Sequence, residues 1–100
     1  MIKIRSVGFV CMANYCRSPV AKILFKNKYG DSFTVNSAGL KPMISAGMDP
    51  RSIDYLKKNN ISLTIHNPKK VDRNFFNSCD VVFAMDINIL MLLNKTFKKY

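Results

Sequence analysis

A cysteine and an arginine with five residues between them stand out near the start of the chain, in the segment Cys11-Met-Ala-Asn-Tyr-Cys-Arg17-Ser18. A cysteine thiolate is a strong nucleophile, and the planar guanidinium of arginine matches the oxygens of a phosphate group. Ser18 can donate a hydrogen bond to the thiolate or cap a helix. Together these side chains predict a site that binds an oxyanion and attacks it through sulfur.

The segments on either side are predicted to position this motif. Residues 3–10 contain a short apolar run typical of a buried strand, so the motif starts where that strand ends. Ser18 followed by Pro19 is the order of N-cap and first helical residue, and Gly30 is expected to end the helix. A loop that leads into a helix points its N–H groups at one spot, which binds anions and stabilises a thiolate.

The rest of the chain alternates strands with helices. Strands are expected over 33–37 and 80–85, a long loop over 38–48, a short extended piece over 61–65, and helices after the caps Asp49, Asp72 and Asp86. This order predicts a small parallel sheet in a three-layer α/β/α fold, as a single domain over 1–100. Ser37 and Asp86 end or follow strands, so they are expected beside Cys11, at the edge of the sheet where ligands bind.

The apolar residues of the expected helices are assigned to the core by their spacing. In the last helix the inward residues are predicted to be Ile89, Leu90, Leu93 and Phe97, and the run from Met85 to Leu93 is so apolar that one of its faces is expected to lack a partner. Phe75 and Phe76, like Leu56, are interpreted as core residues and not as part of a site.

The segment from Val10 to Pro19 resembles the signature loop of the low molecular weight protein tyrosine phosphatases. Ser37-Ala-Gly-Leu40, Gly47-Met-Asp-Pro50, His66 and Phe83-Ala-Met-Asp86 follow in the order that this family shows, over about the whole chain. The gapless stretch from Ser37 to Pro50 resembles the bacterial branch linked to polysaccharide export and its tyrosine kinases.

The resemblance implies roles for individual residues. Cys11 is the nucleophile that forms a phosphocysteine, and Arg17 acts with it in catalysis. The phosphate-binding loop comprises Met12, Ala13, Asn14, Tyr15, Cys16, Arg17 and Ser18, supported by Asn14, Ser18, Ser37 and His66. Cys16 is the family's second cysteine, which can form a reversible disulfide with Cys11. No metal or organic cofactor is implied.

The chain also departs from the family. Ala13 replaces a frequent glycine, Tyr15 stands where an aliphatic residue is common, and Met43 and Ile44 occupy the place of an aromatic residue. The family takes its general acid from an Asp-Pro loop after a fourth strand, and this chain ends at Tyr100, before that strand. We therefore expect the family's C-terminal strand and helix to be missing and the general acid with them, since Asp49-Pro50 is interpreted as a helix start.

Two functions are compatible with these residues. The first is a phosphatase that hydrolyses phosphotyrosine on proteins, a bacterial tyrosine kinase among the candidate substrates. The alternative is a module that binds phosphate or phosphotyrosine with little turnover. A thiol relay through Cys79, as in the related arsenate reductases, is disfavoured because Cys79 precedes the last strand and lies at the amino end of the sheet.

Charge and cysteine content indicate which partners and which cellular compartment to expect. The formal net charge of +10 favours anionic partners, but the basic residues are dispersed and no aromatic residues alternate with them, so specific nucleic-acid binding is not expected. The odd count of three cysteines favours reduced thiols and a cytoplasmic protein. The first apolar run is too short for a signal peptide, and no stretch reaches the length of a spanning helix, so no membrane partner is expected.

Overall fold

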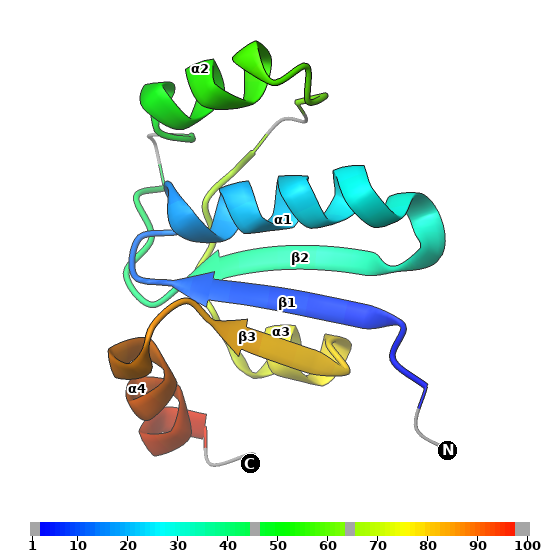
Figure 1. Ribbon diagram of the computed structural model, residues 1–100. Coiled ribbons are helices and arrows are strands. Elements are labelled where there is room, and N and C mark those ends of the chain that lie inside the picture. Colours follow the sequence, from blue (N-terminus) through cyan, green and yellow to red (C-terminus); the bar gives the residue numbers. More distant parts are fainter. Residues whose placement is uncertain (1–2, 45–46, 64–65, 98–100) are drawn as a thin grey trace.

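The computed structural model describes residues 3–44, 47–63 and 66–97. A three-stranded sheet forms its centre, with helices on both faces (Figure 1). The elements, in chain order, are β1 (Ser6–Cys11), α1 (Arg17–Tyr29), the 3₁₀ turn η1 (Gly30–Ser32), β2 (Thr34–Gly39), α2 (Pro50–Lys58), α3 (Arg73–Ser78), β3 (Val81–Ala84) and α4 (Ile87–Phe97).

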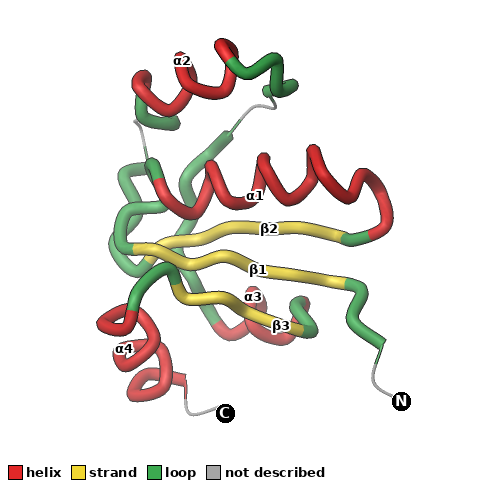
Figure 2. The backbone as a smooth tube through the Cα atoms, viewed as in Figure 1, coloured by secondary structure: helices red, strands yellow, loops and turns green. Residues whose placement is uncertain are grey.

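The strands are parallel and lie in the order β2-β1-β3, which confirms the predicted sheet. The helix α1 covers one face and α3 lies on the other, so the fold is the expected three-layer α/β/α arrangement (Figure 2). The central strand β1 carries the chain to Cys11, which pairs with Gly39 at the end of β2. All three strands therefore deliver their carboxyl ends to one edge.

Two apolar clusters hold these layers together. The larger lies between the sheet and the helices α3 and α4, and consists of Val10, Ala38, Val71, Phe75, Phe76, Cys79, Ile89 and Leu93. The smaller joins α1 to α2 through Ile23, Met48 and Leu56. The predicted core positions Phe75, Phe76 and Leu56 are confirmed.

Acidic caps start the three later helices, as predicted. Asp49 accepts a hydrogen bond from the backbone N–H of Arg51, Asp72 from that of Phe75, and Asp86 from that of Ile89. Each side chain thereby satisfies one of the N–H groups that a helix leaves unpaired at its start.

The predicted cap at Ser18 is wrong. The helix α1 begins at Arg17, and Cys16 occupies the N-cap position without a side-chain hydrogen bond. The Ser18 hydroxyl instead forms hydrogen bonds with the Cys11 sulfur and the Asn14 amide. The expected strand boundaries also shift: the residue pairing of β1 with β2 begins at Ser6. The predicted extended piece over 61–65 forms no strand at 61–63, and residues 64 and 65 lie outside the described residues.

The flank formed by β3 and α4 exposes large apolar side chains. Ile87 is 66% exposed and Met91 63%, as the apolar run predicts. Phe83 on β3 is 49% exposed, although the sequence predicts a buried strand over 80–85. Leu90 is also exposed, which corrects its assignment to the core: Ile89 and Leu93 already face the sheet, and Leu90 lies on the other side of α4. No helix of the described residues is long and apolar enough to cross a membrane.

Candidate active site

Cys11 lies at the end of β1 with its sulfur enclosed by hydrogen-bonding groups. The sulfur is 2.9 Å from the Ser18 hydroxyl oxygen and accepts a hydrogen bond from the backbone N–H of Asn14 at 3.2 Å. Asn14 donates through its amide to the same hydroxyl oxygen, which leaves the hydroxyl hydrogen available to the sulfur. The sulfur of Cys11 therefore has two hydrogen-bonding groups beside it, at the N-terminal end of α1.

Asn14 joins the loop to the rest of the fold. Its side chain is completely buried, and its amide donates to the hydroxyls of both Ser18 and Ser37. Its side-chain carbonyl oxygen accepts from the backbone N–H of Lys69 at 3.0 Å. The backbone of Asn14 is left-handed, with φ of 52°, a conformation that asparagine tolerates better than most residues. The predicted support by Asn14, Ser18 and Ser37 therefore corresponds to one connected network.

His66 contacts the same residue from the other side. Its Nε2 lies 2.6 Å from the backbone carbonyl of Asn14, to which it donates as the neutral imidazole with its proton on Nε2. Partial burial lowers the pKa of His66, and the positive charges of Lys22 and Lys69 lower it further. The histidine is thus held neutral, in a position to brace the loop.

The segment after β2 supports the loop along its length. Four backbone N–H groups of this segment donate to loop carbonyls at 2.7–3.1 Å: Leu40 to Cys11, Lys41 to Met12, Met43 to Ala13 and Asp49 to Tyr15. Gly39 makes this approach possible, because a β-carbon there would lie 2.7 Å from the backbone nitrogen of Asn14. The sequence assigned Gly39 no role of its own in the site, although its place two residues after the second predicted strand was the available signal.

The carbonyls of the loop are thereby directed to the segment after β2, while several of its N–H groups remain available. Among the described residues, the N–H groups of Ala13, Tyr15 and Cys16 have no acceptor. Unpaired N–H groups at a helix start are the usual cradle for an anion. Met12 is exposed, and Tyr15 is half-buried.

Arg17 forms an ion pair that the sequence did not predict. Its Nη1 donates to the Asp86 carboxylate at 2.7 Å, and both side chains are partly exposed. The hydrogen bond from Arg17 holds the pKa of Asp86 below its ordinary value, helped by the backbone N–H of Ile89. The same pair raises the pKa of Arg17. Asp86 therefore links the start of α4 to the guanidinium beside the loop.

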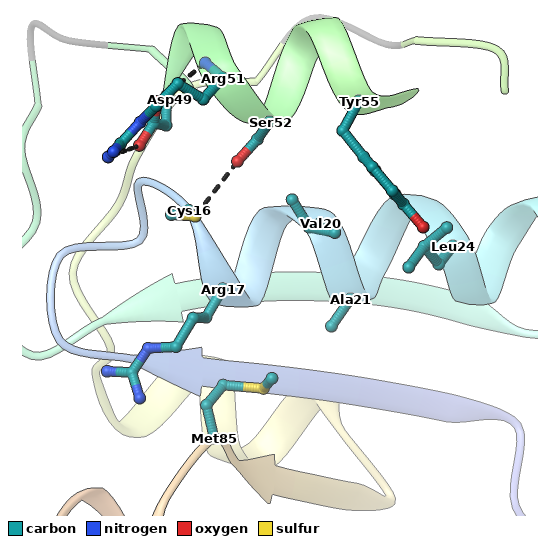
Figure 3. A pocket seen from close by; sticks show the side chains of 10 residues that line it. All are labelled: Cys16, Arg17, Val20, Ala21, Leu24, Asp49, Arg51, Ser52, Tyr55 and Met85. Carbon is teal, nitrogen blue, oxygen red and sulfur yellow. Dashed lines mark hydrogen bonds and ion pairs between the residues drawn. The ribbon is translucent and has the colours of Figure 1, made fainter. Parts of the chain in front are cut away.

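The side chain of Cys16 points toward α2. Its sulfur lies 3.1 Å from the Ser52 hydroxyl. Figure 3 shows this contact as a dashed line between Cys16 and Ser52 on α2. The two side chains line a cavity of about 600 Å³, together with Arg17, Tyr55 and Met85 among others. A disulfide between Cys11 and Cys16 would have to break the contact with Ser52, and it stays a prediction. None of the three cysteines is in a disulfide.

Cys79 lies elsewhere. Its sulfur packs against β1 at Gly8, where an added β-carbon would come within 2.8 Å of it. Gly8 precedes Cys11 by three residues, so Cys79 lies roughly 10 Å along the strand from the loop.

Among the described residues no group of three His, Cys, Asp or Glu side chains could hold a metal ion.

Comparison with known proteins decides the family. A family model described as low molecular weight phosphotyrosine protein phosphatase matches residues 6–100. The chain belongs to this family. The match includes every residue of the loop, so the family predicted from the signature segment is confirmed.

Individual members of the phosphatase family match at moderate identity. The low molecular weight phosphotyrosine protein phosphatase of Schizosaccharomyces pombe is 35% identical over 102 residues, which cover 95% of this chain and 65% of that protein. The protein-tyrosine-phosphatase Wzb of Escherichia coli K12 is 32% identical over 77 residues, covering 77% of this chain and 52% of Wzb. This chain therefore spans less than two thirds of the length of these relatives.

Solved structures of the phosphatase family have the same fold. The tyrosine phosphatase AmsI of Erwinia amylovora superposes with a TM-score of 0.90 at 24% identity, covering 97% of this chain and 64% of AmsI. A mutant of the arginine phosphatase YwlE, whose active-site cysteine is replaced by a serine that carries phosphate, superposes with a TM-score of 0.85 at 28% identity. That match covers 95% of this chain and 64% of the YwlE chain.

Proposed function

We propose that this protein is a cysteine-dependent phosphatase that hydrolyses phosphotyrosine on proteins. The observation that carries the proposal is the Cys11 sulfur, which has two hydrogen-bond donors at the end of β1 and lies in a loop with unpaired N–H groups at the start of α1. The S. pombe and E. coli relatives are named as phosphotyrosine phosphatases. The YwlE structure carries phosphate on an active-site serine.

The proposed reaction has two displacements at phosphorus. The Cys11 thiolate forms a bond to phosphorus while the bond from phosphorus to the phenolic oxygen breaks, and tyrosine leaves with the electron pair of that bond. Water then attacks the phosphocysteine, releases inorganic phosphate and restores the thiolate. The Ser18 hydroxyl, 2.9 Å from sulfur, stabilises the thiolate as a leaving group in this second step.

The loop holds the phosphoryl oxygens during both steps. The backbone N–H groups of Ala13, Tyr15 and Cys16 are the proposed donors, because they have no acceptor among the described residues. Arg17 supplies two further donor nitrogens, Nε and Nη2, since Asp86 occupies only Nη1. Asp86 orients the guanidinium, so that a phosphate can bind to its remaining nitrogens.

The binding module with little turnover remains a second candidate, and one observation favours it. The two carboxylates nearest the loop, Asp49 and Asp86, are each paired with an arginine, and those hydrogen bonds lower the pKa of both. Neither is a ready proton donor to the departing tyrosine at neutral pH. In this case a phosphotyrosine protein, such as a bacterial tyrosine kinase, is bound more than it is hydrolysed.

The variant Cys11→Ser tests the proposed reaction. We expect it to release no phosphate from a phosphotyrosine peptide, while it still binds inorganic phosphate, because the loop donors are unchanged. Met91→Lys, a substitution on exposed α4, is the control and should hydrolyse at the wild-type rate. Wild-type turnover by Cys11→Ser would refute covalent catalysis by Cys11. If the wild-type protein hydrolysed phosphoarginine peptides but not phosphotyrosine peptides, the proposed substrate would be wrong.

A further inference from the structure

A second cavity opens on the side of α1 that faces the segment after α2. Its volume is about 280 Å³, close to the lower end of the range for small-molecule sites. The residues that line it are Lys22, Ile23, Lys26, Asn27, Gly30 and Ser62. None of them takes part in the loop around Cys11.

Two lysines line this cavity, and neither forms an ion pair with a described residue. Lys22 is half-buried, and both burial and the neighbouring Lys69 and Lys26 lower its pKa. The ion pairs of the described residues are Arg17 with Asp86 and Arg51 with Asp49, and neither involves these lysines. Ammonium groups that repel one another gain free energy when an anion enters between them.

Most of the acidic residues of the chain are engaged away from this cavity. Four of the six aspartates accept hydrogen bonds at element ends, namely Asp49, Asp72, Asp80 and Asp86. Of the other two, Asp54 lies on α2, and Asp31, which follows the cavity residue Gly30, is exposed and forms no ion pair within the described residues. Within the described residues, no ion pair therefore neutralises the lysines of the cavity, and an anionic ligand can do so.

We infer that this cavity binds a small organic phosphate, held by Lys22 and Lys26. Lysine ammonium groups bind phosphate as point charges, and a phosphomonoester carries close to two negative charges at neutral pH. Asn27 and Ser62 add hydrogen-bonding groups, and Ile23 offers an apolar surface to the organic part. The site is independent of phosphate transfer at Cys11 and does not rest on the proposed function.

The test must separate this cavity from the loop, which also binds phosphate. Glycerol phosphate is titrated at physiological salt into the ¹⁵N-labelled 100-residue chain carrying Arg17→Ala, which removes the guanidinium of the loop. The backbone signals of Ile23, Asn27 and Ser62 report on the cavity. We expect them to shift together and to saturate.

Matched variants decide between a site and general attraction. In the same background, Lys22→Met with Lys26→Met removes two charges at the cavity, and Lys57→Met with Lys58→Met removes two from exposed α2. We expect the first pair to weaken binding by at least about tenfold, as the loss of charge-assisted hydrogen bonds requires, and the second to change it less than about twofold.

Two results would overturn the inference. One is an equal loss of affinity in both pairs of variants, which would mean that only the net charge attracts the anion. The other is the absence of saturation at Ile23, Asn27 and Ser62. Because the measurement is binding and not hydrolysis, neither result depends on whether Cys11 is the nucleophile.

Discussion

The loop end of the sheet and the flank formed by β3 and α4 differ in which kind of side chain they bury. At the loop end, Asn14, Ser18 and Ser37 are polar and almost completely buried. On the flank, Phe83 and Met91 are large, apolar and about half exposed or more. Among the described residues, no buried side-chain nitrogen or oxygen lacks a hydrogen-bond partner.

The comparison shows where rigidity is needed. A loop that holds phosphate must keep its N–H groups in place. Here it is held by hydrogen bonds to the buried Asn14 side chain and by backbone hydrogen bonds from Leu40, Lys41, Met43 and Asp49. The flank contributes through the sheet-facing side of α4, which carries Ile89 and Leu93. Its outer side can vary with little effect on the loop.

The largest effect is expected when the leaving group is varied. Asp49 and Asp86 stay ionised because hydrogen bonds from arginine lower the pKa of both. Hydrolysis by the 100-residue chain should therefore depend steeply on the leaving group. Aryl phosphates with acidic leaving groups should exceed phosphotyrosine by roughly the 10²–10⁴-fold that a positioned general acid contributes. The measurement is a plot of log rate against leaving-group pKa.

A flat plot would show that the loop end does contain a proton donor. Asp86→Asn then identifies it, because asparagine still caps α4 but cannot donate an acidic proton. A plot that turns steep in this variant would assign the acid to Asp86, contrary to our expectation.

Next in size is the loss of the Asn14 side chain. Asn14→Ala leaves Ser18, Ser37 and the Lys69 N–H without their partner and places alanine at a φ of 52°. We expect a loss of about 2–4 kcal/mol in the free energy of unfolding, measured with urea, and a large fall in activity. Asn14→Gly should recover about 1 kcal/mol of stability by relieving the backbone, with no recovery of activity. Equal stability of the two variants would contradict the backbone argument.

A smaller effect is expected from pH through His66. Burial lowers its pKa in the folded state, so the unfolded chain binds the proton more readily. The contribution of His66 is complete above its unfolded pKa of about 6.5 and is lost as the pH falls below it. His66→Gln keeps an amide donor without the titration. Between pH 7.5 and 5.5 its urea midpoint should fall less than that of the wild type, and an equal fall would assign the loss to other groups.

The smallest effect is expected on the outer side of the flank. Met91→Lys should change the free energy of unfolding by no more than about 0.5 kcal/mol and reduce self-association, measured by sedimentation. Leu93→Ala, two residues further along α4 and buried, should cost about 2–5 kcal/mol. A large loss in Met91→Lys would mean that the outer face of α4 is covered after all.

Much of the fold could be predicted because its signals are local. An apolar run identified β1, the aspartate caps identified three helices, and spacing placed Cys11 and Arg17 between a strand and a helix start. Local spacing misassigned Ser18 and Leu90, because the partners that decide their orientation are distant in sequence or supplied by packing.

The sequence by itself determined the chemistry that the loop can carry: a thiol, a guanidinium and N–H groups at one helix start. Only the tertiary structure decided how these groups are held. Arg17 meets Asp86 across 69 residues, Cys16 meets Ser52 across 36, and Gly39 admits the loop at a distance that excludes a β-carbon. Such contacts leave no periodic trace along the chain, because they arise from the packing of strands and helices whose relative positions the whole sheet sets.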